Sequence, residues 1–396
     1  MSSHTSTSPR SLDWVIKLCS IDSTSRLSNL PVIEVIADEA RRLGLDPKIC
    51  PRPDNPEKAN LLITVPAADG STAGGVVLSG HTDVVPVDGQ EWDSDPFTPE
   101  VRDGRLYGRG TCDMKGFIGV AVALLPDMIA ADLAEPIHLA LSYDEEIGCI
   151  GGEQIVKDIA NLGLTPRAAI IGEPSSMRVI TGHKSVNLAR VTFHGKAAHS
   201  SLTSAGVNAV EYAAKFISYV RIRADEWKAE GPFDETYELP YTTTGTNMVT
   251  GGIASNTVPE LCVLHCEFRT IGAVNPQVTM AEYEAYARDL EAQMQMEDSS
   301  ASVDFEVLAA VPGLETPQGA GAISLGRELG GVPSDDKVTY GTEAGQFSGA
   351  GIEAVVCGPG DIAQAHAANE WIALDQLVAC EEFITQLIDR SSRRSA

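Results

Sequence analysis

Four short apolar runs recur along the chain, and each is followed by a histidine or an acidic residue. The runs are 75–78, 137–142, 168–171 and 353–357. Helical patterns separate them, and strands that alternate with helices predict a parallel or mostly parallel sheet. In such sheets, ligands bind beyond the carboxyl ends of the strands. The sequence therefore predicts an α/β fold with a mostly parallel sheet, in which the polar residues after these runs share one crevice.

The polar residues at the predicted strand ends combine imidazoles with carboxylates. Together with one aspartate at a helix start, they are His81, Asp113, Glu145, Glu146, Glu173 and His366. Asp83 follows His81 by two positions, a spacing that suits a metal ligand and the group that orients it. Asp113 lies where a single helix is expected to open and to continue to Met128. Taken alone, a plain strand-end turn at His81 and a helix N-cap at Asp113 are competing interpretations.

The charge of this cluster favours a metal site. Four carboxylates that converge in one crevice without cations would be very costly to desolvate. A mixture of His, Asp and Glu without thiolates suits zinc or a closely related divalent ion. Two ions that share one carboxylate bring the total charge close to neutral and leave one carboxylate as a general base. Because such metal pairs activate water and polarise carbonyl groups, the predicted reaction is hydrolysis of an amide or peptide bond.

The segment 184–311 has a different pattern from the rest of the chain. It reads as strand, helix, two strands, helix and strand, and this βαββαβ order predicts an inserted α+β domain. The predicted boundaries place 1–183 and 312–396 in a discontinuous metal-binding domain and 184–311 in the insert. Residues 186–193 alternate between apolar and polar, with an expected phase slip near Arg190.

Composition argues against several classes of partner. The formal net charge of −26 disfavours nucleic-acid binding and attachment to anionic membranes. The chain contains no apolar run of ~18 residues, the length that a membrane span requires. Residues 1–8 lack the apolar core of a secretory signal, and eight thinly spread cysteines include no C-x-x-C pair. These features predict a cytoplasmic protein with reduced thiols, in which Cys262 and Cys266 pack rather than bind metal.

The order and content of these motifs resemble the two-zinc aminoacylase and metallopeptidase family that contains acetylornithine deacetylase and succinyl-diaminopimelate desuccinylase. The resemblance covers nearly the whole chain after Ser11, and it is carried by 79–86, 108–110, 113–116, 144–146 and 172–175. It implies a catalytic domain of the zinc-peptidase type. It also implies that the insert is a lid and dimerisation domain, so a second copy of the chain is an expected partner.

The resemblance assigns metal ligands within the cluster. Asp113 would bridge two divalent ions, with zinc as the expected metal and cobalt as an alternative. His81 and Glu173 would hold one ion, and Glu146 and His366 would hold the other.

Two further roles follow from the same resemblance. Glu145 would be the general base that deprotonates the attacking water and later protonates the leaving amine. Asp83 would orient His81. A cis peptide bond is expected between Asp113 and Met114.

The insert also carries residues that match functional positions of the family. His199, within 195–201, would reach the site of the partner subunit and stabilise the tetrahedral oxyanion; a surface histidine in a helix-capping turn is the alternative. Asn256 and Arg269 match substrate-contacting positions. Arg269 suits a carboxylate clamp, although a strand-end salt bridge is a competing interpretation. Thr342 would line the crevice.

Local motifs favour the deacetylase branch of the family. Residues 182–185 stand where desuccinylases tend to carry an arginine-rich stretch, and 342–347 resemble the acetylornithine branch. The expected reaction is hydrolysis of N2-acetyl-L-ornithine to L-ornithine and acetate, a step of arginine biosynthesis. The alternatives are deacylation of another N-acyl amino acid, such as succinyl-diaminopimelate or an aminoacylase substrate, and a non-catalytic metal-dependent binding protein. A binding protein would be expected to lack Glu145 or a ligand, and this chain keeps them all.

Overall fold

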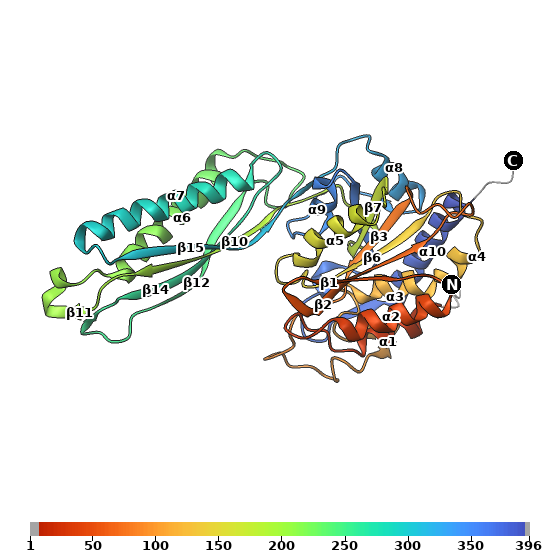
Figure 1. Ribbon diagram of the computed structural model, residues 1–396, viewed down its shortest axis with the longest axis horizontal. Coiled ribbons are helices and arrows are strands. Elements are labelled where there is room, and N and C mark those ends of the chain that lie inside the picture. Colours follow the sequence, from red (N-terminus) through yellow and green to blue (C-terminus); the bar gives the residue numbers. More distant parts are fainter. Residues whose placement is uncertain (1–7, 393–396) are drawn as a thin grey trace. The chain divides into compact units, whose positions relative to one another are not determined.

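The computed structural model describes residues 8–392, and the chain divides into two compact units (Figure 1). The major unit consists of residues 1–182, 315–336 and 342–396. The insert unit consists of residues 183–314 and 337–341. Among residues 8–392, no helix combines the length and the apolar character that crossing a membrane requires.

A six-stranded sheet forms the centre of the major unit. Its strands, in spatial order, are β1 (Lys48–Arg52), β2 (Asn55–Val65), β6 (Ile137–Ser142), β3 (Val76–His81), β7 (Ala168–Pro174) and β18 (Glu353–Gly358). The pairs β6–β3, β3–β7 and β7–β18 are parallel, whereas β1–β2 and β2–β6 are antiparallel. Every residue of β3, β6 and β7 is buried, as expected for strands covered on both faces. The predicted α/β class is confirmed, with a mixed sheet.

Helices cover both faces of this sheet (Figure 1). One face carries α5 (Ile150–Asn161), α8 (Gly321–Glu328) and α9 (Ala344–Gly349), and the other carries α1 (Leu12–Cys19), α2 (Leu30–Arg42), α3 (Lys115–Ala123) and α10 (Leu374–Ser391). The remaining short elements are β4 (Glu100–Arg102), β5 (Arg105–Tyr107), β8 (Arg178–Val179), β9 (Gly182–His183), β16 (Leu314–Glu315), β17 (Val332–Pro333), η2 (Ile362–Gln364) and β19 (Trp371–Ala373).

The single helix expected to run as far as Met128 is divided in two. Helix α3 ends at Ala123, and α4 (Leu125–Ala130) begins after Leu124 with Pro126 in its first turn. Proline has no backbone N–H to continue the hydrogen bonds of α3, and it is well tolerated where a new helix starts. The expectation of one continuous helix was therefore wrong.

The insert unit has the βαββαβ order. Its elements are β10 (Val186–His194), α6 (Ala209–Glu230), β12 (Thr243–Gly251), β14 (Leu261–Arg269), α7 (Pro276–Glu297) and β15 (Ser302–Val311), with the short pieces β11 (Ala198–His199), η1 (Ser200–Ala205) and β13 (Thr257–Val258). The four long strands form an antiparallel sheet in the order β12-β14-β10-β15. Both long helices pack on the same face of it (Figure 1), around a core that includes Phe193, Phe216 and Tyr283.

Strand β10 alternates without the phase slip expected near Arg190. Asn187, Ala189, Val191 and Phe193 are all buried, and Arg190 is exposed. The irregularity in the sequence arises because the polar Asn187 occupies the buried face. Its Nδ2 donates hydrogen bonds to Ser185 Oγ at 2.8 Å and to the Phe268 carbonyl at 3.3 Å, which compensates for its burial.

Candidate metal centre

The sheet of the major unit brings the predicted residues to one edge. His81 is the last residue of β3, and its backbone neighbour on the parallel strand β6 is Ser142. Glu145 and Glu146 therefore follow β6 at the edge where β3 ends. Glu173 lies near the end of β7, which is parallel to β3 on its other side.

His81 is buried, with its two ring nitrogens in different surroundings. Nε2 lies 2.9 Å from Asp113 Oδ1 and 3.5 Å from Glu173 Oε1. Nδ1 lies 3.0 Å from the Asp83 carbonyl oxygen and 3.6 Å from Asp83 Oδ1. Asp83 therefore fixes the orientation of the ring and leaves Nε2 toward the acidic groups, an arrangement found around many metal-binding histidines.

Asp113 stands between two histidines. Its Oδ1 faces His81, and its Oδ2 lies 3.1 Å from His366 Nε2. The same His366 nitrogen lies 3.0 Å from Glu146 Oε2. Asp113 precedes α3 without capping it, because the N-cap residue is Met114, and the peptide bond between these two residues is cis as expected.

Two groups of potential ligand atoms result. In each group, one ligand atom per residue lies within 4.8 Å of the others, and the groups are His81, Asp113 and Glu146, and His81, Glu145 and Glu173. With His366 beside Asp113 and Glu146, the structure brings all six predicted cluster residues together.

The electrostatics of the cluster favour bound cations. Burial raises the pKa of Glu145 to about 8 and that of Glu146 to about 7, and it raises the pKa of Glu173 well above its ordinary value. Hydrogen bonds with Asp113 and Glu146 raise the pKa of His366 to about 11. Among residues 8–392, Glu146 Oε1 is a buried oxygen without a hydrogen-bond partner. The residues present therefore fit two divalent ions in both charge and ligand type.

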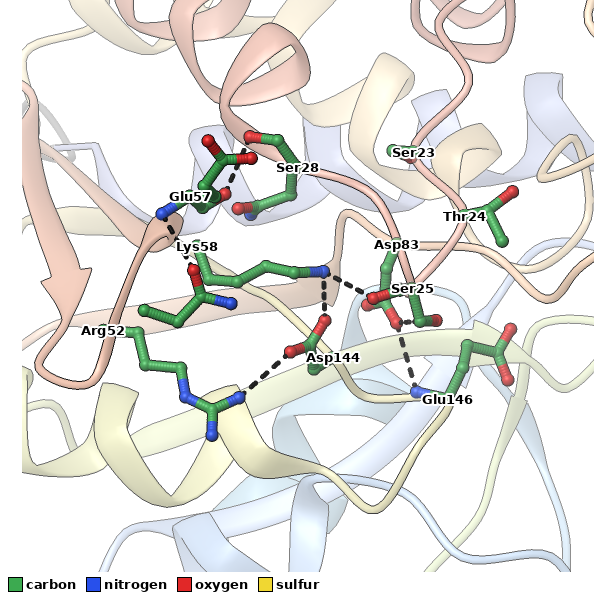
Figure 2. A network of polar contacts seen from close by, with 12 residues as sticks. Ser23, Thr24, Ser25, Ser28, Arg52, Glu57, Lys58, Asp83, Asp144 and Glu146 are labelled. Atoms are coloured by element: carbon green, nitrogen blue, oxygen red, sulfur yellow. Dashed lines mark hydrogen bonds and ion pairs between the residues drawn. The ribbon is translucent and has the colours of Figure 1, made fainter.

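Glu145 is held at its backbone and at its side chain. Asp83 Oδ1 accepts a hydrogen bond from the Glu145 N–H at 3.1 Å, and Asp83 Oδ2 accepts one from the Glu146 N–H at 3.4 Å. The same Oδ2 accepts from the Ser25 hydroxyl at 2.6 Å (Figure 2). The Cys149 thiol donates to Glu145 Oε1 at 3.1 Å.

Glu370 supports the loop that carries Asp113, and sequence reasoning missed it. Its Oε2 accepts from Arg109 Nη1 at 2.6 Å and from the Gly110 N–H at 3.1 Å. Its Oε1 accepts from the N–H groups of Cys112 at 2.9 Å and Asp113 at 3.1 Å. The only sequence signals were an arginine between two glycines and a glutamate that follows His366 by four positions.

Arg109 also connects to the loop that carries His366. Its Nη2 donates to Gln90 Oε1 at 2.6 Å, and Gln90 Nε2 donates to the His366 carbonyl at 2.8 Å. Arg109 and Glu370 are buried. This pair therefore connects the backbones of two candidate ligands.

The insert unit brings two of its predicted residues together. His199, exposed at the end of β11, pairs with Thr257, and the Ser200 N–H donates to the carbonyl of the exposed Asn256 at 3.0 Å. His199 Nδ1 accepts from the Ser201 N–H at 3.2 Å, so the proton of the neutral ring is assigned to Nε2.

Arg269 and Thr342 have other contacts. Arg269 Nε is ion-paired with Glu267 Oε1 at 2.6 Å, as the salt-bridge interpretation expects. Thr342, in the major unit, is fully buried, and its Oγ1 accepts from the Ala344 N–H at 3.0 Å. The substrate contacts predicted for both residues stay predictions.

Most of the chain matches the model of one known protein family. Residues 77–390 match the family model described as peptidase family M20/M25/M40. This chain belongs to that family. Membership of the M20 group makes the chain a hydrolase of peptide or amide bonds.

The matches between this M20 chain and similar solved structures cover nearly its whole length. A tripeptidase from Staphylococcus aureus is 21% identical with a TM-score of 0.74, and the match covers 97% of this chain and 98% of that one. An M20 metallo-carboxypeptidase from Sulfolobus solfataricus is 17% identical with a TM-score of 0.75, covering 96% and 99%. A dinuclear metal-binding M20 peptidase from Bacillus subtilis is 14% identical with a TM-score of 0.65, covering 96% of each chain. At these identities, the likeness concerns the fold.

Proposed function

We propose that this M20-family chain hydrolyses the acetyl amide of N2-acetyl-L-ornithine to L-ornithine and acetate, in arginine biosynthesis. The observation that carries the hydrolytic part is the convergence of two potential ligand groups that share His81, one of which contains the half-buried Glu145. The choice of substrate is supported by residues 182–185 and 342–347, which resemble the acetylornithine branch.

The cluster residues would hold the metal ions as the resemblance implies. Asp113 would contact both ions, His81 and Glu173 would hold one, and Glu146 and His366 would hold the other. Zinc is the proposed metal, with cobalt as an alternative. When bound, such ions lower the pKa of water and polarise the carbonyl group of the substrate.

The proposed base is Glu145. Its carboxylate would take a proton from the attacking water and return that proton to the amide nitrogen as ornithine leaves. A base works best when its pKa lies near the working pH, and burial raises the pKa of Glu145 in that direction. Asp83 would hold both the His81 ring and the Glu145 backbone in place.

Residues of the insert unit would recognise the substrate. His199 Nε2–H would donate a hydrogen bond to the developing oxyanion in the site of the partner subunit, and Asn256 would lie beside it. Arg269 would bind the substrate carboxylate, with Thr342 of the major unit lining the crevice. Burial, and to a smaller extent the nearby Arg269 charge, lower the pKa of Lys184 to about 8.

We also propose that the protein is a cytoplasmic homodimer that assembles through the insert unit. Strand β12 is an edge strand of its sheet, and Met248 and Val249 on it are 59% and 50% exposed. An edge strand with exposed apolar side chains can pair with a second copy. Sedimentation velocity tests this proposal, because a Val249→Lys variant should shift the protein to monomer.

A second candidate function is hydrolysis of short peptides. The names of the similar structures, a tripeptidase and a metallo-carboxypeptidase among them, favour it. Both functions use the same proposed metal ligands and base, so only the substrate distinguishes them.

A substrate panel tests the proposal. The zinc- or cobalt-loaded protein is assayed with N2-acetylornithine, succinyl-diaminopimelate, N-acetylmethionine and a tripeptide, with the Glu145→Gln variant as a control for contaminating activity. The highest kcat/KM is expected for acetylornithine. A higher value for another substrate would overturn the substrate assignment. No hydrolysis of any of them would favour the binding-protein alternative.

A further inference from the structure

Lys58 is a buried cation with no role in the site described so far. It lies on β2, and its side chain is 5% exposed. Its Nζ donates to the Ser25 carbonyl at 2.7 Å and to Asp144 Oδ1 at 2.5 Å (Figure 2). Burying an ammonium group is costly unless its partners are well placed. The two contacts offset that cost, and the question is what the buried lysine does for the residues that it contacts.

Asp144 occupies an unusual backbone position directly before Glu145 and Glu146. Its φ is +51°, in the left-handed region that non-glycine residues seldom adopt. Its carboxylate is held by Lys58 on Oδ1 and by Arg52 Nη1 at 3.3 Å on Oδ2 (Figure 2). Such a conformation persists only where the surrounding contacts fix it. The Lys58 contact therefore stabilises the turn from which Glu145 emerges.

The second Lys58 contact reaches the same turn by another path. Ser25, whose carbonyl accepts from Lys58, donates its hydroxyl to Asp83 Oδ2 at 2.6 Å. Asp83 in turn accepts from the Glu145 N–H at 3.1 Å. A closed ring of side-chain and backbone links thus joins Lys58, Asp144, Glu145, Asp83 and Ser25. Figure 2 labels all of them except Glu145 and also shows the contact of Asp83 with the Glu146 N–H. The Lys58 ammonium group makes two of these links, one to Asp144 and one to the Ser25 carbonyl.

We propose that Lys58 is a positioning residue for the proposed base Glu145. It holds Asp144 on one side and Ser25 on the other, and so fixes the backbone from which Glu145 projects. This inference rests on the role proposed for Glu145. A hydrophobic side chain of similar length could fill the volume of Lys58 but would leave Asp144 and the Ser25 carbonyl without their shared donor.

The test compares Lys58→Met and Lys58→Arg with the wild-type holoenzyme. Lys48→Met, which removes an exposed lysine on the neighbouring strand β1, is the matched control. Using whichever substrate the wild type hydrolyses, Lys58→Met should lower kcat about 10- to 100-fold, the range seen when supports of metal-site residues are lost. KM should change little, Lys58→Arg should restore much of kcat, and Lys48→Met should match the wild type.

Hydrogen exchange provides a readout that needs no substrate. In the peptide covering 143–149, Lys58→Met should lose protection at the Glu145 and Glu146 amides, which donate to Asp83. A folded Lys58→Met protein with wild-type kcat and wild-type exchange there would overturn the proposal. If Lys58→Met does not fold, Ser25→Ala can be used instead. This variant removes the hydrogen bond from the Ser25 hydroxyl to Asp83, which belongs to the same ring, and keeps the ion pair between Lys58 and Asp144. It should show the same loss of kcat and of protection. A wild type inactive on every substrate would defeat the proposed function, while exchange would still decide the positioning role.

Discussion

Replacing Glu370 with glutamine should destabilise the loop that carries Asp113. The carboxylate accepts four hydrogen bonds, from Arg109 and from the N–H groups of Gly110, Cys112 and Asp113. Glutamine keeps one oxygen, and its amide N–H groups would face two of these donors. Arg109 would lose its charged partner while buried, a change that costs about 3–5 kcal/mol in comparable pairs. Its remaining contact with Gln90 places the expected loss near the lower end of that range.

Unfolding of the full chain measured in chelator and in excess zinc separates two effects of Glu370→Gln. The decrease in the free energy of unfolding measured in chelator reports the effect on the loop without metal. A further loss of about 1.4–2.7 kcal/mol with zinc would report a 10- to 100-fold weaker metal site, because Asp113 and His366 both depend on this network. Arg109→Met completes a double-mutant cycle and should show strong coupling. The exposed Glu382→Gln is the control. A Glu370→Gln protein within about 1 kcal/mol of wild type under both conditions would refute the reasoning.

Three other predictions concern the base, the insert unit and pH. Glu145→Gln should lower kcat by about 10²–10⁴ with metal content retained, whereas loss of both metals would assign Glu145 a structural role. His199→Ala should lower kcat by about 10²–10³ without changing metal content, and near wild-type activity would contradict its oxyanion role. Burial lowers the pKa of His183 to about 4, so its contribution to stability is complete above its unfolded pKa of about 6.5 and decreases by about 3 kcal/mol as the pH falls toward 4. His183→Gln should therefore lose less stability than wild type in urea titrations between about pH 7 and 4.5.

The central strands could be predicted from sequence because they are buried on both faces. Residues 137–142 and 168–171 read as apolar runs, and the structure has β6 and β7 there. Their ends carry Glu145, Glu146 and Glu173, so a local pattern was enough to place these groups at one edge. The prediction of a phase slip near Arg190 was wrong, because a polar residue in a strand can lie on either face. Asn187 is polar but lies on the buried face of β10.

The supporting residues could not be predicted, because their contacts join distant parts of the chain. Lys58 and Asp144 lie 86 positions apart, and Arg109 and Glu370 lie 261 positions apart. No periodicity or spacing rule relates such pairs. Lys58 follows Asn55 and Glu57 at the polar beginning of β2, so the sequence does not mark this lysine as buried and gives no partner for it. These positions become interpretable only once the folded chain shows which carboxylate each cation meets.

Ion-pair partners divide five buried carboxylates of the major unit into two kinds: those of Asp144 and Glu370, and those of Asp113, Glu146 and Glu173. Asp144 and Glu370 are each ion-paired with a lysine or an arginine, which stays charged at neutral pH. Among residues 8–392, Asp113, Glu146 and Glu173 form ion pairs only with histidines. A histidine can give up its proton and become a metal ligand together with the carboxylate it faces, whereas lysine and arginine would occupy that carboxylate permanently. The first kind therefore holds the loops in place in any state, and the second kind remains available to cations.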